Sequence, residues 1–161
     1  MTASRTLIVM IFAGALLLAA PAAFGEGDLS RGTPVRIRVD LGKAGVAIHK
    51  AYPDKITVET GKLYKLTLYN PTKEPHYFTS PRFASKIWTF KVQVKSKIGE
   101  GSKILGKVRG AIEEVEVYAG QVLEWWFVPV STGTFVARCR IRYKDQKSHA
   151  QKGERVTITI K

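Results

Sequence analysis

The 161-residue sequence has little cysteine and little methionine. Cys139 is the single cysteine, so an internal disulfide is excluded and the chain must be stabilised by its hydrophobic core or by a bound metal. Met1 and Met10 are the only methionines, and both lie close to the start of the chain. Any segment that begins after Met10 therefore lacks a thioether ligand altogether.

Recognisable catalytic motifs are absent as well. The chain has no Gly-rich phosphate-binding loop, and the residues around Cys139 match no protease signature. Its carboxylates are scattered, with no obvious acid–base pair. We therefore do not expect an enzyme.

Long apolar runs are limited to one stretch, from Leu7 to Ala20. Arg5 precedes this run and small residues follow it, which is the pattern of a secretory signal peptide cleaved after Gly25. The run is short for a membrane span, and an uncleaved anchor is the alternative. We predict a signal peptide over residues 1–25 and one domain over residues 26–161, located in the periplasm or secreted.

Acidic residues are few, with 13 against 26 lysines and arginines, and the formal net charge is +13. Arg5 is the only charged side chain among the first 25 residues, which leaves +12 for residues 26–161. Such a field favours acidic proteins or anionic membrane surfaces as partners. Export argues against nucleic acid.

Residues 26–161 show the period-two alternation of β-strands in one segment after another. The clearest runs are Val35–Val39, Tyr64–Leu68, Trp88–Val94 and Val156–Ile160, with Gly and Pro turns between segments. The Gly- and Lys-rich stretch 95–110 is predicted to be an exposed hairpin, and no window has helical periodicity. These features predict a monomeric all-β sandwich or barrel.

The stretch from Phe135 to Ile160 carries two side chains that bind soft metals. Cys139 and His149 lie on a loop between two predicted strands, and a thiolate with an imidazole can form half of a metal site. Cys139 alternates with Arg138 and Arg140, so it is expected to point inward. The alternatives are that Cys139 is a small buried core residue and that His149 is a surface histidine.

Other stretches occur in an informative order around this loop. Tyr52 to Asn70 gives two strands and leads to a loop that ends at His76, and Val115 to Gly120 gives a strand and a Gly turn. Gly133-Thr134-Phe135 then leads to Cys139. Together, over residues 50–161, these features resemble the cupredoxins, the copper proteins of the plastocyanin and azurin type. The resemblance implies a Greek-key β-sandwich.

The resemblance also implies a site for one copper ion. It gives His76 as the first imidazole ligand, Cys139 as the thiolate and His149 as the second imidazole. Glu154 stands where the family has its axial methionine and is the candidate fourth ligand. The alternatives are an ordinary hydrogen-bonded histidine at position 76 and a surface carboxylate at position 154. His49 lies outside the family's ligand positions and is interpreted as a strand-end or surface residue.

Two features depart from the family's pattern. Nine residues, Arg140 to Ser148, separate the cysteine from the second histidine, which is more than the family usually has. A carboxylate at position 154 excludes a blue-copper site with a weak thioether ligand.

The function implied by the resemblance is electron transfer or copper handling by an exported protein. Its partner would be an acidic redox protein or a copper-handling protein. One alternative is a cupredoxin-fold binding module that has lost its metal and binds an acidic protein or an anionic envelope surface. Another is a copper chaperone with an exposed site, which the long polar loop suggests.

Overall fold

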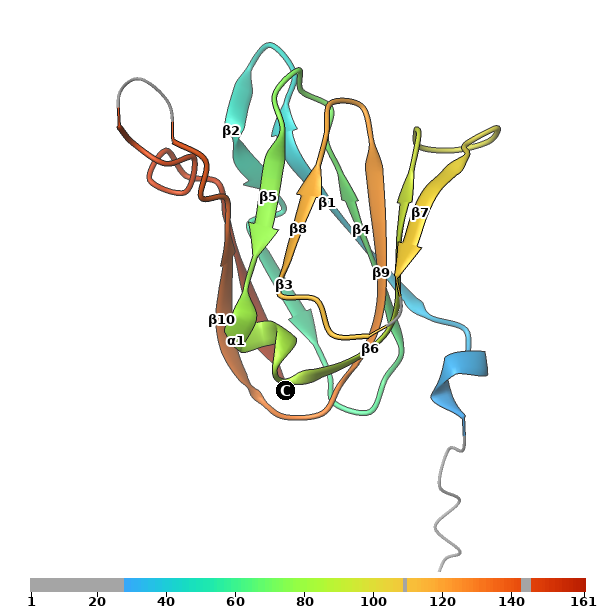
Figure 1. Ribbon diagram of the computed structural model, residues 1–161. Coiled ribbons are helices and arrows are strands. Elements are labelled where there is room, and N and C mark those ends of the chain that lie inside the picture. Colours follow the sequence, from blue (N-terminus) through green and yellow to red (C-terminus); the bar gives the residue numbers. More distant parts are fainter. Residues whose placement is uncertain (1–27, 109, 143–145) are drawn as a thin grey trace, which may run out of the picture.

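Two β-sheets pack against each other in a computed structural model that describes residues 28–108, 110–142 and 146–161 (Figure 1). The architecture confirms the predicted all-β sandwich. The predicted signal peptide lies outside the described residues. Within the described part of the chain, no helix is long and apolar enough to cross a membrane.

The first sheet has six strands. Its spatial order is β2 (Ala47–Tyr52), β1 (Val35–Lys43), β4 (Tyr64–Tyr69), β9 (Val122–Pro129), β6 (Ile87–Lys95) and β7 (Ile104–Val108). β1 and β4 are parallel and the other neighbours are antiparallel. β6 and β7 form the hairpin that was predicted over residues 95–110.

The second sheet has five strands. Its spatial order is β3 (Lys55–Val58), β11 (Arg155–Ile160), β10 (Gly133–Arg138), β5 (His76–Thr79) and β8 (Glu114–Val117). The predicted alternation is clear in β11, where Val156, Ile158 and Ile160 are buried and the residues between them are not. The described residues add two short helical turns, η1 (Leu29–Arg31) and α1 (Pro81–Ala84).

Aromatic rings fill the space between the sheets. Trp125 and Phe127 come from β9, Phe78 comes from β5, and Phe83 comes from α1. The Phe83 ring lies edge-on to Phe127 at 5.3 Å and to Trp125 at 6.0 Å between centroids. The indole N–H of Trp125 donates to Oγ1 of Thr89 at 3.1 Å, so the buried polar group of the ring is satisfied. α1 therefore closes the core although it is only one turn long.

Replacing Phe83 by alanine is expected to lower the free energy of unfolding by about 3–5 kcal/mol, because it removes a fully buried ring and leaves a cavity. Chemical denaturation followed by fluorescence measures this loss. Val130→Ala is the control, since Val130 is 62% exposed and its replacement should change stability by less than about 0.5 kcal/mol. Equal effects of the two substitutions would contradict this description of the core.

Candidate metal centre

The order of the strands brings three of the predicted ligands to one end of the five-stranded sheet. β10 is antiparallel to both neighbours, and its last residue, Arg138, pairs with Arg155 at the start of β11 and with Thr79 at the end of β5. The chain beyond Arg138 therefore runs back along β5, where the N–H of Tyr77 donates to Sγ of Cys139. His76 is the first residue of β5, Glu154 directly precedes β11, and Cys139 directly follows β10. Positions more than sixty residues apart in sequence therefore meet at the same end of the sandwich.

The long loop after Cys139 folds back on itself. The backbone N–H of His149 donates to the carbonyl of Ile141 at 2.9 Å, and Arg142 forms a β-bridge with Ser148. In Figure 1 the described parts of this loop, residues 139–142 and 146–154, lie beyond the ends of β10 and β11. His149 thus returns to Cys139 although nine residues separate them in sequence.

A tight turn places Glu154 next to His149. The backbone N–H of Glu154 donates to the carbonyl of His149 at 2.9 Å, and the carbonyl of Glu154 accepts from the N–H of Cys139 at 3.3 Å. Gly153 closes the turn with a φ of +115°, a conformation that side chains with a Cβ rarely adopt. The turn thus fixes the carboxylate against both the cysteine and the histidine.

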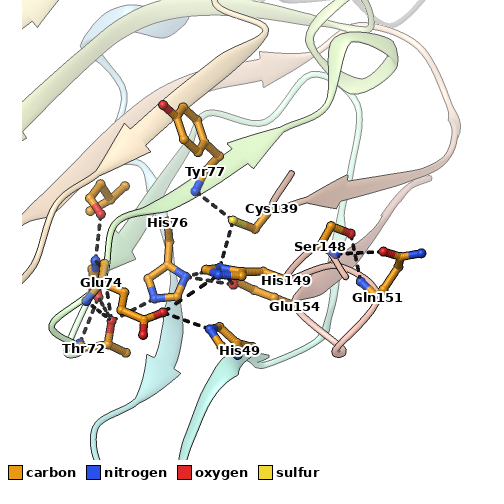
Figure 2. Close-up of polar contacts among 12 residues, drawn as sticks. His49, Thr72, Glu74, His76, Tyr77, Cys139, Ser148, His149, Gln151 and Glu154 are labelled. Atoms are coloured by element: carbon orange, nitrogen blue, oxygen red, sulfur yellow. Dashed lines mark hydrogen bonds and ion pairs between the residues drawn. The ribbon is translucent and has the colours of Figure 1, made fainter. Parts of the chain in front are cut away.

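All four predicted ligands converge, and we call this set the inner site (Figure 2). Nδ1 of His76 lies 2.8 Å from the Glu154 carboxylate, and Nδ1 of His149 lies 3.2 Å from it. Nδ1 of His149 also lies 3.4 Å from Sγ of Cys139. One ligand atom from each of the four residues falls within 4.8 Å of the others, and every side chain is at most 2% exposed. A single ion could therefore contact all four.

The loop between β4 and β5 holds the ring of His76 in place. Oγ1 of Thr72 donates to Oδ1 of Asn70 at 2.8 Å, so it can accept the Nε2–H of His76, also at 2.8 Å. Asn70 is fixed in turn through its Nδ2, which donates to the carbonyl of Val117 at 2.7 Å. These contacts leave the imidazole lone pair on Nδ1, which faces the inner site. Such outer hydrogen bonds orient metal-binding histidines.

Without an ion, burial disfavours the charged forms of the ionisable side chains in the inner site. Burial, followed by the charge of Glu154, raises the pKa of Cys139 to about 11, although backbone hydrogen bonds from Tyr77 and Ile141 oppose the shift. Burial and the neighbouring histidines lower the pKa of His149 to about 4. Burial also raises the pKa of Glu154. A bound cation would reverse these effects by stabilising the thiolate and the carboxylate. The donor set therefore fits a metal ion.

Without metal, the raised pKa of Cys139 is expected to destabilise the protein in alkali. A raised thiol pKa favours folding below the unfolded value near 9, and this contribution disappears as the pH rises towards 11. The loss is about 3 kcal/mol for a shift of this size. Denaturation of metal-free protein between pH 8 and 11 measures it. In Cys139→Ala, which has no thiol to titrate, the free energy of unfolding should fall by about 3 kcal/mol less over the same pH range. If the free energy of unfolding changed equally with pH in the two proteins, the expectation would be contradicted.

His49 and Glu74 are functional candidates that the sequence analysis did not identify. His49 lies within β2, with a side chain only 15% exposed, and its Nε2 is 3.0 Å from Oε2 of Glu74. Its ring also packs on His149, with 3.9 Å between centroids. The interpretation of His49 as a strand-end or surface residue is thus wrong on its location. One feature of the sequence could have indicated this group, namely that Glu74 is a carboxylate only two residues before His76.

Arginines dominate the outer surface beside the inner site. Arg138, Arg140, Arg142 and Arg155 line an open pocket of about 660 Å³ that reaches Cys139. Arg138 and Arg155 are directly paired across β10 and β11. Like charges that face each other in a sheet are destabilising, so negative charge placed beside this pair would stabilise it.

Comparisons with known proteins identify the fold and no closer relationship. No protein-family model matches the sequence, and no curated protein matches it. The multicopper oxidase from Campylobacter jejuni, described as a metallo-oxidase, has a similar structure, with a TM-score of 0.53 and 12% identity. The match covers 80% of this chain and 30% of the oxidase chain.

Smaller copper proteins are also found. Auracyanin A, a "blue" copper protein from Chloroflexus aurantiacus, matches with a TM-score of 0.45 and 12% identity over 80% of this chain and all of its own. Dithionite-reduced auracyanin from Roseiflexus castenholzii matches with a TM-score of 0.40 and 13% identity over 81% of this chain and 99% of its own. The fold of this protein is cupredoxin-like, as the sequence resemblance implied.

Proposed function

We propose that the protein binds one copper ion in the inner site and acts in electron transfer or copper handling. The observation that carries the proposal is the convergence of His76, Cys139, His149 and Glu154 at one buried end of the sandwich. Both histidines present Nδ1 to the same space as the thiol, so two imidazoles and a thiolate can bind from three sides. Copper at such a site would supply a centre that accepts and releases one electron.

The chain's own residues set how such a centre would behave. Two imidazoles and a thiolate suit copper in both oxidation states, and the carboxylate of Glu154 adds a hard, anionic donor that favours Cu(II). The backbone N–H of Tyr77 donates to Sγ of Cys139 at 3.3 Å, which stabilises negative charge on the sulfur. The surrounding strands hold the donors in fixed positions, which limits reorganisation between the two states.

A titration with Cu(II) tests the proposal. The purified protein should bind one equivalent and develop an intense absorption band from charge transfer between the thiolate and the metal. Metal analysis of the protein as isolated separates copper from zinc, because the same donor set suits tetrahedral zinc. If the protein binds no metal, it is a binding module without metal. If it prefers zinc, the inner site is a zinc site and the copper proposal fails.

The proposal places the protein outside the cytoplasm as a carrier without catalytic activity. The charged start, the apolar run and the small residues within residues 1–25 support export. A similar fold makes up 30% of the multicopper oxidase chain, so the proposed lack of catalytic activity is tested by an oxidase assay of the copper-loaded protein. Mass spectrometry of the protein recovered from the periplasm or medium should give a chain that begins at Glu26. Electron exchange with a redox protein, as opposed to transfer of copper to an acceptor, separates the two proposed roles.

Partner binding is expected to depend strongly on salt, because we propose an acidic partner for the arginine-rich surface. The Debye length falls from about 30 Å at 0.01 M salt to about 3 Å at 1 M, so the association rate should fall steeply over that range. Stopped-flow mixing with an acidic redox protein measures the rate. Exchanging Arg140 and Arg142 for glutamine should reduce the salt dependence, and a rate insensitive to salt would contradict the proposed docking surface.

A further inference from the structure

A second group of metal-binding side chains lies beside the inner site. It consists of His49, Glu74 and His149, and we call it the outer cluster. One ligand atom from each of the three residues falls within 4.8 Å of the others. The side chains of His49 and Glu74 are 15% and 34% exposed, whereas every residue of the inner site is at most 2% exposed. The outer cluster is therefore partly exposed to solvent, and the inner site is buried.

His149 belongs to both groups through different atoms. Its Nδ1 lies 3.4 Å from Sγ of Cys139, whereas its Nε2 lies 3.9 Å from Oε2 of Glu74. Nε2 of His49 lies 3.0 Å from the same carboxylate oxygen. Figure 2 shows Glu74 and His49 next to His149, on the side of its ring away from Cys139. The imidazole of His149 thus separates a buried donor set that includes sulfur from a partly exposed donor set of nitrogen and oxygen.

The chemistry of the outer cluster suits a divalent transition metal. Two imidazoles and one carboxylate are a donor set for Cu(II) or Zn(II), and solvent at Glu74 leaves room for water as a further ligand. Burial pushes the pKa of Glu74 upward, but the hydrogen bond and charge of His49 outweigh this and lower the pKa. The carboxylate is therefore anionic and ready to bind a cation at neutral pH. Without a thiolate, the outer cluster should bind copper less tightly than the inner site.

We propose that the outer cluster is a second copper site, which takes up Cu(II) from solution and passes it to the inner site. The uptake step stands on the outer cluster alone, and the transfer step rests on the proposed copper binding at the inner site. The buried donors would then be filled through His149, the one residue that the two sites share.

A neutral imidazole has one lone pair for a metal. When Cu(II) binds Nε2 of His149, the proton of the ring is on Nδ1, and when it binds Nδ1 the proton is on Nε2. The two sites are therefore occupied in turn. In the transfer, Cu(II) leaves His49, Glu74 and Nε2 of His149 and binds the inner donors. The thiol of Cys139 releases its proton to water, His149 exchanges its proton with water, and copper keeps its oxidation state.

Stopped-flow mixing of the purified protein with Cu(II) tests the transfer step. The thiolate charge-transfer band should form at a rate that saturates with copper concentration, because uptake at the outer cluster precedes transfer. His49→Ala and Glu74→Gln should each slow formation of the band at low copper at least tenfold, without changing its final intensity. Glu59→Gln is the matched control, because Glu59 follows the far end of β3 and its carboxylate pairs with Lys62 at 2.7 Å. Rates within twofold of the unmodified protein for both variants would overturn the proposal.

A second measurement separates the outer cluster from the inner site. In Cys139→Ala, which cannot give the coloured complex, electron paramagnetic resonance should still detect one Cu(II) with nitrogen ligands. Adding His49→Gln, which keeps a polar side chain of similar size, should raise its dissociation constant at least tenfold, with the fold checked by circular dichroism. If the band never forms in the unmodified protein but this dependence on His49 is found, the outer site stands and the proposed function fails. Copper binding that does not depend on His49 would overturn the outer site.

Discussion

Cys139→Ser is expected to abolish the coloured Cu(II) complex completely. The band requires a thiolate bound to the metal, and serine offers only a hydroxyl that does not ionise at neutral pH. Cys139 is the single cysteine, so no other thiol can replace it. Visible absorption during a Cu(II) titration of the variant and of the unmodified protein measures the change.

Two comparisons make this result specific. The fold should survive, because serine is nearly the same size as cysteine and Cys139 lies just beyond the end of a strand, directly after β10. His76→Ala should weaken copper binding but keep a thiolate band, since it removes one imidazole and leaves the sulfur. A band of unchanged intensity in Cys139→Ser would show that the thiolate is no ligand.

Glu154→Met is expected to raise the reduction potential of the copper complex and to shift its spectrum towards that of a blue-copper site. Nδ1 of both histidines lies within 3.2 Å of the Glu154 carboxylate, so this group would be an anionic neighbour of the ion. Even at about 4 Å from the ion, a unit charge contributes roughly 4 kcal/mol at an effective dielectric constant of 20, or about 170 mV for one electron. Removing it favours Cu(I), and a thioether adds to the effect.

Protein-film voltammetry measures the potential. Glu154→Gln is the matched control, because it keeps the size of the side chain and a donor oxygen but removes the charge. Its potential should lie between those of the unmodified protein and Glu154→Met. A potential that stays the same in both variants would show that position 154 does not face the metal.

Much of the fold could be predicted from the sequence, because each strand with one buried face carries its own signal. Val156, Ile158 and Ile160 alternate with polar residues, and this local pattern fixes which side chains of β11 face the core. The same reasoning placed Cys139 inward, since it continues the alternation of Phe135 and Ala137. These inferences need only neighbours in sequence.

Contacts between distant segments were harder to predict. The return of His149 to Cys139 depends on backbone hydrogen bonds within the long loop, and the side chains of its polar residues give no signal for that pairing. His49 precedes His149 by one hundred residues in the chain. The two rings pack together because the fold brings β2 to the same end of the sandwich. No local sequence pattern predicts a contact between segments so far apart. The four residues of the inner site could be named in advance because the family resemblance supplied their order, and the structure brings them together.

The most direct test of the copper site is an anomalous difference map from crystals of the copper-loaded protein, recorded at the copper absorption edge. We predict one strong peak within about 2–2.3 Å of Nδ1 of His76, Sγ of Cys139 and Nδ1 of His149. The carboxylate of Glu154 should complete the coordination. A map with no peak among these atoms, or with peaks only at surface residues, would contradict the account.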